Sequence, residues 1–326
     1  MRRAHSPITS PGIATRTAGA KNMPPLESAD RIKEACGQLL REAGVRDALP
    51  TPVEDIVAAS ELRIGSNDLF SEEMLERAPK DMADRMRALK GKVRAVLDRR
   101  ERKVYVSPEV QLAARRRFLT LHEVGHDILP WQRDLYFPDD DYTLSWAAKK
   151  LQEREANCAG AEMLFQGDFF ARTAAEFRVG MAEIADISGM FGASTQAGLR
   201  RFAEGHEGAV AGMVMQRSPA TVTPLTFKRR EAVSSALWST RFPAVSGWPK
   251  VLDVERYPFL AEVGRLGIEP PPIAFTTQLL DLEGEMQEVH GQLVSNSYNV
   301  LVLLWVPARE WLKRRRAFAV TSATPS

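Results

Sequence analysis

The sequence predicts a mixed α+β protein that is mainly helical in its N-terminal part. Apolar residues recur at spacings of three and four through most of residues 28–205, which is typical of helices packed on a core. Short runs rich in β-branched residues replace this pattern at 93–107, and again after residue 208. We expect a disordered tail at 1–25, a mainly helical domain with a small β-sheet at 26–178, a helix-turn-helix-like pair at 179–206, and an α+β domain at 207–326.

Composition excludes several classes of protein. The net charge is +2, so the total charge predicts no general affinity for nucleic acid. The longest apolar run, residues 300–306, is far shorter than a membrane span, and the N-terminus lacks the apolar core of a secretory signal. Two cysteines, Cys36 and Cys158, form no disulfide framework or metal pair. These features favour a cytoplasmic protein that makes no membrane contact.

The N-terminal elements are predicted from caps and periodicity. A first helix is expected at 28–43, with Ser28 as its cap. Thr51 and Glu54 have capping-box spacing at the start of a second helix. Two further helical pieces are expected at 72–77 and 81–90. A β-hairpin is expected at 93–107; its edge could hold an extended peptide, or the hairpin could only cover the core.

The helix predicted at 115–129 carries the clearest chemical signal. His122 and His126 are four residues apart, so both imidazoles lie on one helix face and can bind one metal ion. Glu123 is one step further round the helix, where it could reach a water at that metal. This is the HExxH pattern of zinc proteases. The chain contains only five histidines, which makes the spacing informative.

A second helix, predicted from Ser145 to about residue 164, supplies a third ligand. A catalytic zinc site needs three protein ligands and an open position. Glu153 can be the third, and Asn157, one turn later, can hydrogen-bond a histidine ligand and fix its tautomer. Glu155 is the rival ligand, but it points to a different face. A loop is expected between the two helices, at 130–143.

These motifs resemble the ImmA/IrrE family of bacterial metallo-endopeptidases. The resemblance rests on the strand at 104–107, on Arg116-Arg117-Phe118, on His122 to His126 and on Glu153 to Asn157, and it covers roughly residues 26–205. It implies a cytosolic, zincin-like protease whose metal ligands are His122, His126 and Glu153, with Glu123 as the catalytic acid/base. The chain departs from the family at Ala159 and Gln166, where a Phe and a Pro are common.

The resemblance also implies a partner. Characterised members cleave helix-turn-helix transcriptional repressors, which de-represses stress or mobile-element genes. Such a protein substrate is therefore expected here. At least one member carries a GAF-like domain after the catalytic part, which suggests a sensor or regulatory role for residues 207–326.

Several alternatives stay open from the sequence. Zn²⁺ suits two histidines and a glutamate, although Mn²⁺ or Fe²⁺ could occupy the same site. Tyr136, Tyr142 and His206 are candidates for a donor that stabilises the oxyanion. A non-proteolytic regulator or toxin-antitoxin component, which binds a repressor or DNA through a structural metal site, is the alternative function.

The remaining elements complete the prediction. Helices are expected at 169–178, 181–191 and 195–204, the last two forming the helix-turn-helix-like pair. The second of that pair offers only Arg200 and Arg201 as basic residues, so a structural role is favoured over DNA reading. Strands are expected at 209–216 and 298–306. A helix is expected from Arg229 to Trp238, and another at 308–317.

Overall fold

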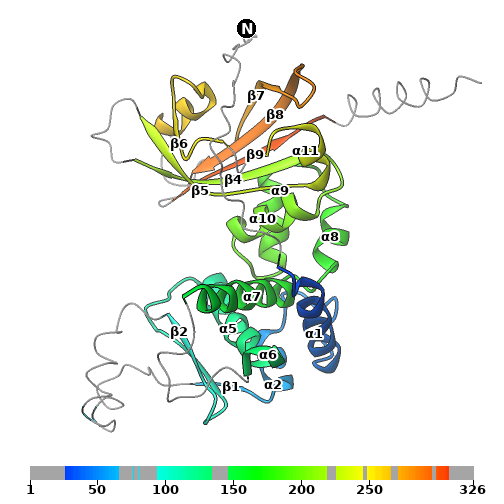
Figure 1. Cartoon of the computed structure of the whole chain (residues 1–326), viewed down its shortest axis with the longest axis vertical. Helices are drawn as coiled ribbons and strands as arrows, with labels where there is room; N and C mark the ends of the chain where they lie inside the picture. Colours follow the sequence, from blue (N-terminus) through cyan, green and yellow to red (C-terminus); the bar gives the residue numbers. More distant parts are fainter. Residues whose placement is uncertain are drawn as a thin grey trace, which may run out of the picture. The chain divides into compact units, whose positions relative to one another are not determined.

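The computed structural model is a mixed α+β protein with two β-sheets (Figure 1). It describes residues 26–65, 76, 80, 94–133, 146–218, 225–244, 248–265, 271–295 and 299–307. The chain divides into two compact units. The N-terminal unit comprises Pro24–Arg172 and Ile187–Ser194, and the C-terminal unit comprises Thr173–Asp186 and Thr195–Ser326, together with Met1–Met23. In the described ranges, no helix has the length and apolar character that crossing a membrane requires.

The N-terminal unit combines helices with a three-stranded sheet. Its helices are α1 (Ala29–Glu42), α2 (Val53–Ala59), α5 (Ala113–Ile128), α6 (Pro130–Arg133), α7 (Trp146–Leu164) and α8 (Phe169–Ala174). The strands are β1 (Arg63–Ile64), β2 (Ala95–Asp98) and β3 (Lys103–Val106), in the order β1-β3-β2. The predicted hairpin is therefore confirmed as the antiparallel pair β2–β3, and the helix expected at 115–129 is confirmed as α5.

Helices α5 and α7 lie side by side, and glycine makes their close approach possible (Figure 1). A Cβ atom on Gly160 of α7 would lie 3.1 Å from the backbone nitrogen of His122 and 3.2 Å from its Cα. A Cβ atom on Gly125 of α5 would lie 3.0 Å from the Cβ of Ala159. These distances leave no room for larger side chains at the helix crossing. The two backbones can therefore bring side chains of both helices to one point.

Among the described strands, β2 lies at one edge of the small sheet. The carbonyl of Val104 in β3 accepts the Gly65 N–H at 2.9 Å, so Val104 directs its backbone groups toward β1. Leu97 is paired with Val104 in the β2–β3 register. Because paired residues of an antiparallel ladder alternate between bonded and non-bonded pairs, Leu97 directs its own N–H and C=O away from β3.

Two side-chain cap bonds expected from the sequence do not form. Ser28 precedes α1, but its hydroxyl makes no cap bond and instead donates to Glu155. The residue before α2 is Pro52, and Thr51 donates its hydroxyl to the Leu164 carbonyl at 2.7 Å. Ser28 is therefore confirmed at the N-cap position but without the cap bond, whereas the cap expected at Thr51 is wrong. In both cases a tertiary acceptor takes the hydroxyl that a local cap would use.

The C-terminal unit is built on a six-stranded antiparallel sheet. The preceding helices are α9 (Met181–Met190) and α10 (Thr195–Gly205), which confirm the expected helix, turn and helix. The sheet has the order β6-β5-β4-β9-β8-β7. Its strands are β4 (Val210–Arg217), β5 (Thr226–Ser234), β6 (Val251–Asp253), β7 (Ile273–Leu280), β8 (Met286–Ser295) and β9 (Val300–Trp305). The 3-10 helix η2 (Pro258–Arg265) follows β6.

Both faces of this sheet are packed. Met213, Val302 and Leu293 lie in register across β4, β9 and β8, and all three are buried in the larger core. On the opposite face, a Cβ atom on Gly212 would lie 3.1 Å from the Leu199 side chain. Glycine at this position therefore lets α10 pack directly against β4.

Three further expectations are corrected by the structure. Arg229 lies in β5, not in a helix that ends near Trp238; only α11 (Ala236–Arg241) is helical there, and it begins after Ser235, whose hydroxyl caps the Trp238 N–H at 3.1 Å. The loop expected at 130–143 begins as α6, since Pro130 suits a first helical turn. The helix expected at 169–178 ends at Ala174. The pieces expected at 72–77, 81–90 and 308–317 lie outside the described residues, apart from Glu76.

Candidate metal centre

Three side chains from α5 and α7 converge on one point. The Nε2 atoms of His122 and His126 are 3.2 Å apart. One carboxylate oxygen of Glu153 lies 3.4 Å from the Nε2 of His122, and the other lies 3.5 Å from the Nε2 of His126. All the candidate ligand atoms lie within 4.8 Å of one another. The structure thus brings together the three residues that the sequence suggested as ligands.

The spacing of these atoms fits a tetrahedral cation. Zinc binds histidine nitrogen at about 2.0–2.1 Å, so two ligand atoms in a tetrahedral site lie about 3.3–3.4 Å apart. The three observed separations, 3.2, 3.4 and 3.5 Å, are close to that value. Two imidazole nitrogens and a carboxylate form a donor set that zinc favours. These residues can therefore hold a divalent metal ion.

The charges at this point favour a cation. Hydrogen bonds from His122 and His126 hold the pKa of Glu153 far below its ordinary value. Burial lowers the pKa of His126, but hydrogen bonds to Glu153 and Gln132 outweigh burial and leave the pKa raised. Protons and a metal ion compete for the same nitrogens. A negative carboxylate held beside two imidazoles would attract either a proton or a metal ion to this point.

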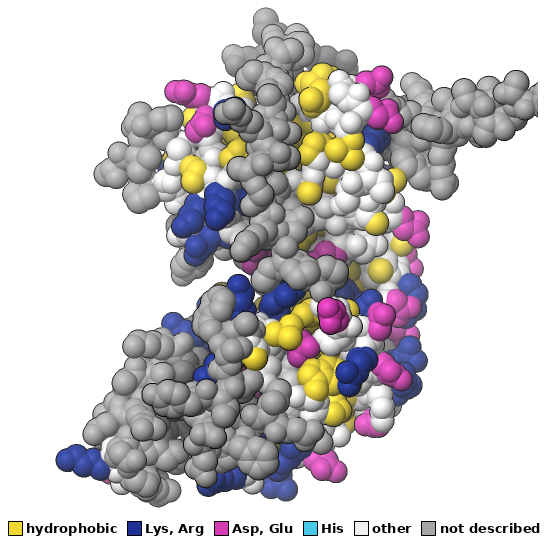
Figure 2. All heavy atoms as spheres, viewed as in Figure 1, with side chains coloured by type: hydrophobic (Ala, Val, Ile, Leu, Met, Phe, Trp, Pro, Cys, Tyr) yellow, Lys and Arg dark blue, Asp and Glu magenta, His cyan; other side chains and the backbone are white. Residues whose placement is uncertain are grey.

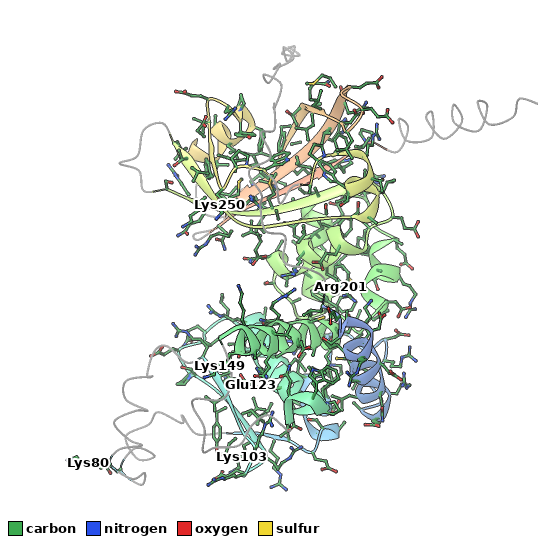
Figure 3. All side chains as sticks on the ribbon, viewed as in Figure 1. Lys80, Lys103, Glu123, Lys149, Arg201 and Lys250 are labelled. Atoms are coloured by element: carbon green, nitrogen blue, oxygen red, sulfur yellow. The ribbon has the colours of Figure 1, made fainter. Side chains whose placement is uncertain are left out.

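Glu123 has the environment of a general base. Its side chain is buried, and burial raises the pKa of its carboxyl even though His122 and His126 lie nearby. The carboxylate accepts a hydrogen bond from the backbone N–H of Leu97, which is the N–H that points outward from the edge of β2. Glu123 therefore interacts with both histidines and with the backbone of β2; Figure 3 labels its position in the N-terminal unit.

A second group of side chains holds His126. Its Nδ1 is 2.8 Å from the Oε1 of Gln132, on α6. The Nε2 of Gln132 donates to the Glu155 carboxylate at 2.8 Å, and also to the Gln152 carbonyl at 3.2 Å. Glu155 is only 5% exposed, although it carries a carboxylate. Glu155, the alternative third ligand in the sequence analysis, therefore bonds to Gln132 and is not one of the three residues whose ligand atoms meet.

His122 has a different environment. Its Nδ1 is buried, and no described residue bonds to it. The ring of Phe118, one turn earlier, is tilted against it with a centroid distance of 6.4 Å. On its Nδ1 side, packing rather than a hydrogen bond from a described residue therefore orients this ring.

Two arginines of the hairpin turn fix the end of α5. Arg99 donates to the backbone carbonyl of His126 at 2.8 Å. Arg102 donates to the carboxylate of Asp127 at 2.7 Å and to the Ser60 carbonyl at 2.7 Å. Asp127 is 1% exposed and directly follows the second histidine. The hairpin and the metal-binding helix are thereby joined by charge-assisted bonds.

The other residues suggested by the sequence lie elsewhere. Asn157 is exposed, and none of the contacts within the described chain joins it to a histidine ligand. His206 follows α10 in the C-terminal unit, where its Nδ1 accepts the Gly208 N–H at 2.8 Å. Tyr136 and Tyr142 lie outside the described residues. The bond that Asn157 was expected to make is made by Gln132, which the sequence analysis did not single out.

Comparisons with known proteins identify a protein of similar fold but no family for this chain. No protein-family model matches the chain, and neither does any curated protein. A solved structure described as a Mycobacterium tuberculosis transcriptional regulator is similar, with a TM-score of 0.50 and 12% sequence identity. The match covers 86% of this chain and 90% of that one. At this identity the similarity concerns the fold alone.

Proposed function

We propose that this protein is a zinc-dependent endopeptidase that hydrolyses a peptide bond in a protein substrate. The observation that carries the proposal is the convergence of His122, His126 and Glu153 at tetrahedral spacing, with the buried carboxylate of Glu123 beside them. The site suits zinc, and Mn²⁺ or Fe²⁺ could take the same ligands. The donor set and the HExxH helix support the proposal of a zincin-like fold.

In the proposed reaction, the metal ligands, Glu123 and Leu97 have separate roles. A zinc ion bound at such ligands supplies Lewis acidity, which makes water acidic and polarises a carbonyl. Glu123 accepts the proton of the attacking water and later gives it to the leaving amine. A raised pKa suits this double role, because the group must hold the proton between the two steps. The N–H of Leu97 keeps the carboxylate aimed at the site.

The outer edge of β2, which pairs with no other described strand, offers a place for the substrate backbone. Residues of β2 that alternate with Leu97, such as Ala95, direct their N–H and C=O to the same outer edge. An extended peptide could add to this edge as a further strand beside Glu123. The proposed substrate is a helix-turn-helix repressor in the cytoplasm, as the ImmA/IrrE resemblance implies, and a GAF-like C-terminal unit would regulate its cleavage.

Replacement of Glu123 by Gln tests this function. The variant should keep its zinc content, since Glu123 is not a ligand, and should lose cleavage of a helix-turn-helix repressor encoded beside the gene. Glu109→Gln, an exposed change in the same unit, is the matched control and should cleave normally. If Glu123→Gln cleaves the repressor at the wild-type rate, the proteolytic mechanism is wrong.

One observation favours a second function, binding without cleavage. Lys228, Arg230 and Lys250 are exposed at one end of the six-stranded sheet, where Figure 2 shows a group of basic side chains. Such a surface could contact DNA or an acidic partner. Under this alternative the metal site is structural, so Glu123→Gln would retain full biological activity and an alanine change at Lys250 would reduce it.

A further inference from the structure

A chain of hydrogen bonds runs from His126 into the core of the N-terminal unit. It passes from the Nδ1 of His126 to Gln132 and on to the carboxylate of Glu155, with both links at 2.8 Å. The same carboxylate accepts the Trp131 indole N–H at 2.8 Å and the Ser28 hydroxyl. Three donors, two from α6 and one from the residue before α1, thus hold Glu155 in place.

The partners of Gln132 decide which way its amide points. One end of the amide faces the Glu155 carboxylate and the Gln152 carbonyl, and both of these oxygens can only accept. The NH₂ group must therefore occupy that end. The carbonyl oxygen of Gln132 then faces the Nδ1 of His126, and an oxygen there can only accept.

The direction of these bonds determines where His126 carries its proton. Because the Gln132 oxygen accepts, the Nδ1 of His126 must be the donor, and in the neutral ring the Nε2 keeps its lone pair. That Nε2 is the atom that faces His122 and Glu153. We infer that Gln132, anchored by Glu155, is a positioning residue that selects the metal-binding tautomer of His126.

The anchor is built to resist reorientation. Glu155 is 5% exposed and Gln132 is 1% exposed, so water does not compete for their bonds. Trp131 is fixed from its other side by Arg31, whose guanidinium lies 4.1 Å from the ring centroid. A reversed amide would bring its oxygen against the Glu155 carboxylate, which is repulsive. The tautomer is therefore selected by packing among residues that are not themselves candidate metal ligands.

This inference rests on the proposed metal site, and its test separates the two. Gln132→Met keeps the side-chain volume but removes the acceptor at Nδ1. Zinc affinity, measured by competition with a chromophoric chelator, should fall about 10–100-fold, as for other changes behind a metal-binding histidine. Gln152→Met is the matched control, because Gln152 gives Gln132 only its backbone carbonyl, and it should bind zinc like the wild type.

Glu155 provides a graded comparison. In Glu155→Gln the amide oxygen can still accept the bond from Gln132, while the new NH₂ can donate to the Ser28 oxygen. In Glu155→Met no acceptor is left for Gln132, whose amide can then reverse. Glu155→Gln should therefore retain much more zinc affinity than Glu155→Met. Equal affinity in the two variants would overturn the role given to Glu155.

The tautomer itself can be observed without metal or variants. Long-range ¹H–¹⁵N NMR of the metal-free wild type, at an alkaline pH where the ring is neutral, should show the proton of His126 on Nδ1. In Gln132→Met the signal should change to a mixture of tautomers. A wild-type proton on Nε2, or an unchanged tautomer and affinity in Gln132→Met, would overturn the inference. A wild type that binds no zinc but keeps the Nδ1 proton would overturn only the proposed function.

Discussion

Gly160 is the position at which one added methyl group should separate the two halves of the metal site. It lies on α7 two turns after Glu153, against the backbone of His122 on α5. In Gly160→Ala the new Cβ atom would lie 3.1–3.2 Å from main-chain atoms that cannot rotate away. The helices must then move apart by a few tenths of an ångström, and Glu153 moves with α7.

The size of the effect follows from two opposing terms. Overpacking of a closed interface costs about 1–3 kcal/mol. Alanine in a helix interior returns about 1 kcal/mol relative to glycine. The net change in unfolding free energy is therefore a loss of up to about 2 kcal/mol. A shift of a few tenths of an ångström approaches the displacement of about 0.5 Å that a metal site tolerates, so zinc affinity should fall by up to about tenfold, or 1.4 kcal/mol.

Urea unfolding of the metal-free protein and zinc competition measure the two effects. Gly37→Ala is the matched control, because Gly37 lies inside α1 and its Cβ atom would be 3.6 Å from its nearest neighbour, a flexible arginine side chain. That variant should gain about 0.5–1 kcal/mol and bind zinc normally. If Gly160→Ala gains stability as Gly37→Ala does and binds zinc normally, the close helix approach does not position the site.

Three further predictions concern stability. Glu123→Gln should raise the melting temperature of the metal-free protein at neutral pH. The raised pKa of Glu123 means that its carboxyl group binds the proton more tightly in the folded state than in the unfolded state. The stability of the wild type therefore falls as the pH rises from the unfolded pKa through the folded pKa, and the amide of the variant avoids this loss. Arg102→Met should cost about 2–4 kcal/mol in urea unfolding, because it removes the guanidinium that faces the buried Asp127 carboxylate. Ser235→Ala should cost about 2–3 kcal/mol by the same assay, because its buried hydroxyl makes three backbone hydrogen bonds.

Each of these predictions has a contrary result. The advantage of Glu123→Gln should vanish in acid, below both pKa values; an advantage that persists there would have a cause other than the carboxyl proton. Arg94→Met breaks the exposed ion pair with Glu109 and should cost less than about 1 kcal/mol of unfolding free energy. If Arg102→Met loses no more stability than Arg94→Met, burial of the Asp127 carboxylate does not determine the cost. Thr240→Ala, whose hydroxyl bond is exposed, should be nearly neutral beside Ser235→Ala.

The sequence predicted the parts of the site that lie on single helices. His122 and His126 are held by the pitch of α5 alone, so their spacing was sufficient evidence that they share a face. Glu153 required only that a second helix supply the third ligand. The β2–β3 hairpin was visible as two β-rich runs close together in sequence. These features depend on local periodicity, which a sequence displays directly.

The support behind the ligands depends on tertiary structure. Gln132 and Glu155 are separated by 23 residues, and their contact exists only once α6 and α7 have packed. Asn157 was chosen because it is one turn from Glu153, but helical spacing cannot show which face of α7 turns toward the core. Glu155, two residues after Glu153, is on the buried side. In the sequence, the small apolar residues Ala156 and Ala159 near Glu155 were the available sign that this side of the helix is buried.

The same reason explains the missing caps. Ser28 and Thr51 have the residue types and positions of caps, yet their hydroxyls donate to Glu155 and to the Leu164 carbonyl. Arg229 and its neighbours had no strand-like alternation, and their pairing with β4 and β6 makes them part of a sheet. In each case a partner distant in sequence outweighs the local preference.

Zinc bound per chain is the measurement that tests the central claim most directly. Wild-type protein, Glu153→Ala and Asn157→Ala should be loaded with zinc, passed over a desalting column and analysed for metal. The wild type and Asn157→Ala should retain one equivalent, and Glu153→Ala should retain far less. Stoichiometric zinc in Glu153→Ala, or none in the wild type, would contradict a metal centre formed by His122, His126 and Glu153.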